Sequence, residues 1–260
     1  MLFAYWYMFF ACLMIAAVAM TAGIGGATFF VPFVLLVLHV PVSSAVAIGI
    51  FVEIFGFSAG VYNYSRAKKI DYPMAGKLIA SAALFVVLGA VLNRTIKPTV
   101  VEYILILALM IFATQILLAK DIVIGERPKK FDAMGASIAA LGGLLLGFIS
   151  SGLGEANEYN LLVRFRREPA VVAGTSVLVV AVCAVLATAV QVFFITRSGG
   201  FGTIAPYTML IAYSILGAIA GAKVGQLVAE RVDRKRFRMF VSVLLYFVAA
   251  STLAKVLLIH

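Results

Sequence analysis

The chain has 260 residues, of which 64% are hydrophobic and only 12% are charged, and its formal net charge is +10. Soluble domains are about half apolar and about a quarter charged, so a soluble fold could not hide this much apolar surface and lipid must cover it. The basic residues lie in short loops between apolar runs, which is typical of cytoplasmic membrane loops and argues against a nucleic-acid-binding surface. The composition therefore predicts a polytopic all-α membrane protein in contact with lipid.

Apolar segments follow one another along the chain. They cover residues 3–22, 27–40, 42–62, 76–93, 100–119, 133–151, 156–164, 170–195, 204–222 and 238–258. At about 20 residues per crossing, most are long enough to span a membrane as helices, and the chain length allows about eight to ten crossings. The segments 27–40 and 156–164 are too short, and each follows a cluster of glycines. Gly217 and Gly221 lie four residues apart, which predicts close helix packing.

Each short segment belongs to a pattern that occurs twice. Gly23 and Gly25 precede the first short segment, and Gly152 and Gly154 precede the second. In both halves a proline follows, and four residues later an alanine opens a long apolar run. The same order recurs at an offset of about 129 residues, which indicates an internal repeat.

The predicted repeats cover residues 1–125 and 126–260, and five segments per half require the second repeat to be inverted relative to the first. The loop charges agree, because the odd-numbered loops hold 17 Lys and Arg residues and the even-numbered loops hold 4. Lys and Arg mark cytoplasmic loops, so both termini are predicted to lie outside, in an inner-membrane protein. The short segments could either cross the membrane or re-enter on the same side together with the segment before them. Both arrangements place the same loops in the cytoplasm, so the loop charges do not distinguish them. Interrupted segments at corresponding positions of two halves are typical of transport sites.

The glycine breaks and their surroundings resemble both signatures of the TauE/SafE sulfite-exporter family, also called the toluene-sulfonate uptake permeases. The residues that carry the resemblance are 23–28, Val31, Pro32, Pro41 and Ala45, the basic loop 64–71, and Gly152, Leu153, Gly154, Pro169 and 173–176. The resemblance covers nearly the whole chain and implies a secondary transporter of sulfur-containing anions, such as sulfite or organosulfonates. The second break departs from the family pattern, because it carries Glu155 and Glu158.

The glycine breaks are also the candidate substrate site. Helix N-termini aimed at the membrane midplane offer unpaired N–H groups and partial positive charge to an anion, and glycine lets the anion approach closely. Thr28 and Asn157, which the repeat aligns, either add one hydrogen bond each or cap their helices. Thr175 and Ser176 either face the substrate or bond back to a helix carbonyl. The predicted substrate-binding residues are Gly23, Gly25, Gly26, Thr28, Gly152, Gly154, Asn157, Thr175 and Ser176.

Three glutamates are candidates for proton or ion coupling. Glu53 is the one acidic residue inside the apolar segment 42–62, where a charge is costly, so it either carries a proton or is a hydrogen-bonded structural residue. Glu155 and Glu158 are three residues apart and share one face of a helix, where they would bind a coupling cation or a proton. The alternative is a set of salt bridges to Arg164, Arg166 or Arg167.

Three functional classes remain for this sequence. The first is a secondary transporter of a small anion, working by alternating access around the two breaks. The second is a cation- or proton-coupled transporter of another small solute that uses the three glutamates. The third, a membrane enzyme or assembly subunit, is disfavoured because the sequence has no paired histidines, catalytic triad, metal-ligand cluster or P-loop. The sequence thus predicts no enzymatic activity, no cofactor and no metal site, and it is compatible with a homo-oligomer.

Overall fold

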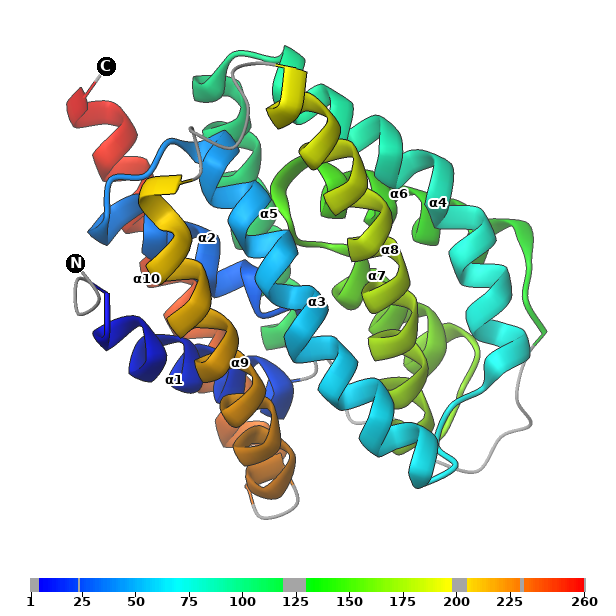
Figure 1. The fold of residues 1–260 in the computed structure, drawn as a ribbon. Coiled ribbons are helices and arrows are strands. Elements are labelled where there is room, and N and C mark those ends of the chain that lie inside the picture. Colours follow the sequence, from blue (N-terminus) through cyan, green and yellow to red (C-terminus); the bar gives the residue numbers. More distant parts are fainter. Residues whose placement is uncertain (1–4, 23, 119–129, 198–204, 230–231, 260) are drawn as a thin grey trace.

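The fold comes from a computed structural model, which describes residues 5–22, 24–118, 130–197, 205–229 and 232–259. Every regular element in these ranges is a helix (Figure 1), which confirms the predicted all-α class. The helices are α1 Tyr7–Ala22, α2 Ala27–Val37, α3 Val42–Arg66, α4 Tyr72–Thr95, α5 Pro98–Leu118, α6 Ala133–Ile149, α7 Leu153–Glu158, α8 Pro169–Arg197, α9 Thr208–Ala229 and α10 Arg234–Ile259. A π-helical turn, Tyr159–Arg164, continues α7, and a 3-10 turn, Ala205–Tyr207, leads into α9.

Six of the described helices are long and apolar enough to cross a membrane, namely α3, α4, α5, α8, α9 and α10. Helices α1, α2 and α6 are shorter, with 16, 11 and 17 residues. The sequence predicts spanning length for 3–22 and 133–151, and this prediction is wrong for the described helices. At 1.5 Å per residue, α1 and α6 cover only about 24–26 Å of a hydrocarbon core of about 30 Å. The described part of α1 begins only at Tyr7, and a left-handed residue, Ser150, ends α6.

The two halves of the chain interlock, because the most extensive helix contacts join a helix of the first half to a helix of the second. Helix α1 packs along α9, α4 along α6, α5 along α10 and α3 along α8. Helices α1 to α5 of the first half correspond in order to α6 to α10 of the second half. When corresponding helices are exchanged, the α1–α9 pair becomes the α6–α4 pair, and the α3–α8 and α5–α10 pairs remain the same pairs. In Figure 1, α3 and α8 run through the middle of the bundle, in front of the short helices α2 and α7.

Glycines allow the closest of these contacts. On α9, Gly217 and Gly221 lie against backbone atoms of α1, and on α4, Gly89 lies against the carbonyl oxygen of Leu144 in α6. A methyl group at any of these glycines would overlap the neighbouring backbone, so the helices touch backbone to backbone. The close packing predicted at Gly217 and Gly221 is confirmed.

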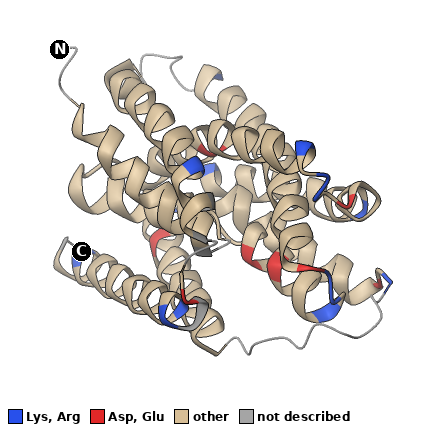
Figure 2. Ribbon diagram, turned by 90° about the horizontal axis from the view of Figure 1, so that it is seen from below, with Lys and Arg blue, Asp and Glu red and all other residues tan. Residues whose placement is uncertain are grey.

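The outer surface of the bundle is apolar. Large apolar side chains point outward from several helices, and among them Leu258 is 87% exposed and Phe247 is 69% exposed. Figure 2, which views the molecule from below, shows that few positions along the helices carry Lys, Arg, Asp or Glu. Such side chains are stable on the outside only where lipid rather than water surrounds them.

Candidate functional site

The break between α1 and α2 meets the break between α6 and α7 inside the protein. A Cβ atom on Gly154 would lie 3.4 Å from the backbone nitrogen of Gly25. The hydroxyl oxygens of Thr28 and Ser151 are 2.6 Å apart. Two motifs about 129 residues apart in the sequence are therefore direct neighbours in space. We call this region the tip contact, and it consists of residues 24–28 and 150–155.

A carboxylate already occupies the start of α2 in the first break. The N–H of Ala27 donates a hydrogen bond of 2.9 Å to Oε1 of Glu53, which reaches across from α3. Glu53 is only 6% exposed. A Cβ atom on Gly25 would lie 3.2 Å from the same Oε1, so glycine leaves the room that the carboxylate uses. The N-terminal N–H predicted to bind an anion is thus satisfied by the chain itself.

A second carboxylate, that of Glu155, joins the two breaks. Its Oε2 accepts the N–H of Gly152 at 3.0 Å, and its Oε1 accepts the hydroxyl of Thr28 at 2.9 Å. Because the Thr28 hydroxyl has a single proton, it cannot also donate to Ser151. With Glu155 ionised, Ser151 is therefore the donor in the Ser151–Thr28 bond. Ser151 of the second break thus donates to Thr28 of the first break, and Thr28 donates to Glu155 of the second break.

The backbone of the second break is sharply turned. Ser150 has φ +61°, and Gly152 has φ +107°. The left-handed region costs a non-glycine residue free energy, and such strain is concentrated at functional sites. The bare Cα of Gly49 on α3 gives Ser150 room, since a Cβ atom there would lie 3.2 Å from Oγ of Ser150.

Several buried polar atoms at or beside the tip contact have no hydrogen-bond partner within the described residues. They are Oε2 of Glu53, Oγ of Ser150, and both side-chain polar atoms of Asn157. Buried polar groups nearly always find a partner in the protein or in water. These atoms therefore mark where a small polar ligand or water would complete the hydrogen bonding.

A cavity of about 50 Å³ opens beside Glu53. Side chains and backbone of α1, α2, α3 and α9 line it, and apart from Glu53 and the thiol of Cys12 the lining side chains are apolar. Gly26 also lines it, and a Cβ atom there would meet nothing within 4 Å. Within the described ranges, no group of three or more His, Cys, Asp or Glu side chains is placed to hold a metal ion.

The structure brings together most, but not all, of the predicted site residues. Ser176 donates a long hydrogen bond, 3.5 Å, to the carbonyl of Gly154, so it touches the second break. Thr175 instead accepts the N–H of Asp71 at 3.0 Å, which fixes the loop between α3 and α4. Glu158 is half-buried and lies about one turn further along α7 than Glu155. Gly23 lies outside the described residues.

Sequence reasoning missed Ser150 and Ser151. They immediately precede Gly152, and two hydroxyl residues beside a glycine break were the available signal. Two of the arginines that follow the second break form ion pairs with aspartates. Arg164 forms its ion pair with Asp132 at 2.7 Å, and Arg167 pairs with Asp71 at 3.2 Å. The Glu155 carboxylate has the hydrogen bonds of the tip contact instead.

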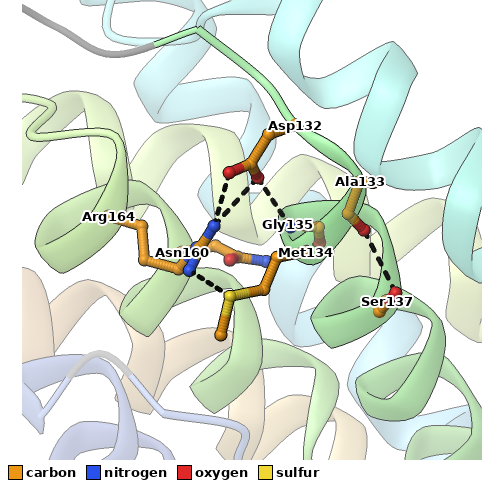
Figure 3. Close-up of polar contacts among 7 residues, drawn as sticks. All are labelled: Asp132, Ala133, Met134, Gly135, Ser137, Asn160 and Arg164. Atoms are coloured by element: carbon orange, nitrogen blue, oxygen red, sulfur yellow. Dashed lines mark hydrogen bonds and ion pairs between the residues drawn. The ribbon is translucent and has the colours of Figure 1, made fainter.

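The Asp132–Arg164 pair holds the end of the π-helical turn against the start of α6 (Figure 3). Asp132 also accepts the N–H of Gly135 at 2.8 Å, and Asn160 donates to the carbonyl of Gly135 at 2.9 Å. The Gly135 hydrogen bond, followed by the Arg164 guanidinium, lowers the pKa of the Asp132 carboxyl. The entry and exit of the α6–α7 unit are thus tied together at one end of the molecule.

Replacing Asp132 by asparagine is expected to lower the melting temperature of the purified protein, because the ion pair to Arg164 is lost. A carboxyl whose folded pKa is depressed contributes stability above its unfolded pKa, which is about 3.9 for Asp. That contribution is lost as pH falls through the lower folded pKa, so the wild type and Asp132→Asn should converge in acid. Thermal unfolding in detergent across pH measures this. Asp233→Asn is the control, since its partner Arg236 is 88% exposed; equal losses for the two variants would contradict the prediction.

The family model described as Sulfite exporter TauE/SafE matches residues 8–252. The matched region includes both breaks, the glutamates at 53 and 155, and every helix that crosses the bundle. No curated protein and no solved structure matches the chain.

Proposed function

The chain belongs to the sulfite exporter TauE/SafE family, and from this membership we propose that it moves a small sulfur-containing anion, such as sulfite or an organosulfonate, across the inner membrane. Family membership and six apolar helices identify an integral multi-pass membrane transporter and not an enzyme. The predicted family and the predicted lack of enzymatic activity are confirmed.

The tip contact is the observation that supports this proposal. A sulfite or sulfonate group presents several oxygens that accept hydrogen bonds, and in a low-dielectric site these must meet fixed donors. The Ser150 hydroxyl and the Asn157 amide have no partner within the described residues, and the hydroxyls of Thr28 and Ser151 become available when Glu155 moves. Backbone N–H groups at Ala27 and Gly152 complete the set once their carboxylate partners move.

We further propose that the two halves, residues 1–125 and 126–260, are inverted repeats that move against each other around the tip contact. The helix pairing supports this, because contacts such as α1–α9 and α4–α6 exchange when the halves are exchanged. In Figure 1 the α3–α4 turn and the start of α8 lie at the lower edge, and the α4–α5 turn lies at the upper edge. With the basic lower edge in the cytoplasm, both termini lie outside.

A second candidate is a cation- or proton-coupled transporter of another small solute. Two buried carboxylates at one polar centre, Glu53 and Glu155, favour it, because carboxylates attract cations and repel anions. Flux of a solute without any requirement for an anion, abolished by Glu155→Gln, would support this candidate over the first.

Uptake into proteoliposomes tests the proposed function. We expect flux of sulfite or methanesulfonate above that of empty vesicles and above that of acetate. Thr28→Val keeps the shape of the side chain but removes a buried hydroxyl bonded to a carboxylate, a hydrogen bond of about 1.5–3 kcal/mol, and should lower uptake about tenfold or more. Thr114→Val is the matched control, because Thr114 lies exposed on α5. Absence of flux for every sulfur-containing anion, or equal loss in both variants, would contradict the proposal.

A further inference from the structure

Glu53 stands where an anionic ligand would bind at the start of α2. Its Oε1 accepts the N–H of Ala27, the first residue of an 11-residue helix, at 2.9 Å. Helix N-termini attract negative charge through their free N–H groups and the helix dipole. The Glu53 carboxylate is therefore an internal ligand for the group that a transported anion would use.

Only one oxygen of the Glu53 carboxylate has a hydrogen-bond partner within the described residues. Its Oε2 has no hydrogen-bond partner although the side chain is more than nine-tenths buried. The same side chain lines the cavity of about 50 Å³, and Gly26 leaves open space at its edge. One hydrogen bond, from Ala27, thus holds a carboxylate that borders room into which it can turn.

The charges around the site disfavour an anion beside an ionised Glu53. Glu53 accepts a hydrogen bond from Ala27 and Glu155 accepts one from the next residue, Thr28, so the two carboxylates are neighbours and repel each other when both are ionised. The hydrogen bonds to both come from backbone N–H groups and Thr28, and none of these donors is a Lys or Arg. The other titratable or charged groups on elements packed against α3 or lining the cavity are Tyr7, Cys12, Glu102, Tyr103, Cys183, Arg197, Tyr213 and Lys223. An incoming anion would make a third negative charge in a poorly solvated centre.

We infer that Glu53 competes with the transported anion for the N-terminus of α2, and that the anion binds only after Glu53 has accepted a proton. The proton adds to the Glu53 carboxylate, which turns toward the cavity, and the Ala27 N–H then donates to the anion instead. No other bond forms or breaks, so each anion enters the site together with one proton. This inference rests on the proposed function and adds its coupling ion.

Methanesulfonate is the suitable probe, because it keeps its single charge across the working pH range. In wild-type proteoliposomes, an inward methanesulfonate gradient with the membrane potential clamped should acidify the lumen, as reported by a trapped pH-sensitive dye. Glu53→Gln supplies a neutral side chain of the same shape, so methanesulfonate exchange should persist while lumen acidification is lost. Glu168→Gln is the control for glutamate replacement, because Glu168 lies in a surface ion pair with Lys69.

A binding measurement on the wild type covers the case in which Glu53→Gln does not fold. If methanesulfonate binds only when Glu53 is protonated, its apparent Kd should decrease by about tenfold for each unit by which the pH falls, over the range where Glu53 is ionised in the anion-free protein. The shift in melting temperature caused by methanesulfonate should therefore grow as pH falls, and in Glu53→Gln it should not change with pH.

Three results would overturn the inference. They are a pH-independent methanesulfonate affinity in the wild type, lumen acidification that survives in Glu53→Gln, or a loss of exchange in a folded Glu53→Gln protein. If the wild type moves neither methanesulfonate nor sulfite, the proposed function itself fails and the inference falls with it. Anion flux without proton movement refutes the inference alone.

Discussion

Replacing Gly89 by alanine is expected to cause the largest loss of stability of any single methyl addition to α4. The new Cβ atom would overlap the carbonyl oxygen of Leu144 in α6, which is backbone and cannot rotate away. Overpacking a core ordinarily costs about 1–3 kcal/mol, and a rigid backbone neighbour places this case at or above the upper end. We expect a lower melting temperature in detergent and little monodisperse protein on size-exclusion chromatography.

Gly76→Ala provides a matched control on the same helix. A Cβ atom at Gly76 meets nothing within 4 Å, and the position is exposed. Alanine there should be neutral or stabilise α4 by roughly 0.5–1 kcal/mol, because glycine is a poor helix former. If Gly89→Ala were as stable as Gly76→Ala, helices α4 and α6 would not be in backbone contact.

Glu155→Ala is expected to have the largest effect on transport among substitutions that leave the helix packing intact. It removes both acceptors that join the breaks, so the N–H of Gly152 loses its partner and the hydroxyl of Thr28 keeps only its bond with Ser151. Each unsatisfied buried donor costs about 1–3 kcal/mol, so we expect at least a tenfold drop in the initial rate of anion uptake. Proteoliposome uptake, normalised to the amount of reconstituted protein, measures this.

Glu155→Gln separates hydrogen bonding from charge at the same position. Its amide oxygen can accept one of the two donors, so its uptake should fall between the wild type and Glu155→Ala. Uptake by Glu155→Ala equal to that of the wild type would show that the carboxylate is not needed to hold the breaks together.

The helical class, the short α2 and the meeting of the two glycine breaks could be predicted from the sequence, because they depend on local features. A cluster of glycines at the end of an apolar run favours a break in the helix, and the length of the apolar run between breaks limits the helix that forms there. The repeated order of glycines around Gly25 and Gly154 indicated that the two breaks would face each other. They do, because a Cβ atom on Gly154 would lie 3.4 Å from the backbone nitrogen of Gly25.

The roles of particular polar residues could not be predicted, because they depend on which distant segments lie side by side. Thr175 was predicted either to face the substrate or to bond back to a helix carbonyl. The loop between α3 and α4 instead folds onto α8, and the backbone N–H of Asp71 donates to the Thr175 hydroxyl oxygen. Glu53 was identified only as the one acidic residue inside the apolar segment 42–62. Its partner, the N–H of Ala27, could be found only once α2 and α3 were placed together.

The end of α7 could not be predicted from the sequence either. The segment 156–164 contains no glycine or proline, so nothing in it indicated that regular α-helix would end at Glu158. The π-helical turn that follows brings Asn160 to the carbonyl of Gly135. This hydrogen bond belongs to the tertiary structure rather than to local helix preference.

Disulfide cross-linking across the tip contact tests most directly whether the two breaks form the anion site. The pair Thr28→Cys and Ser151→Cys, in a background with Cys12 and Cys183 replaced by alanine, places two thiols where hydroxyl oxygens lie 2.6 Å apart. Mild oxidation should form the cross-link rapidly, methanesulfonate should slow its formation, and cross-linking should abolish the uptake that the reduced double variant retains. A pair that does not cross-link, or one that cross-links at the same rate with methanesulfonate present and still transports, would contradict an anion site between the breaks.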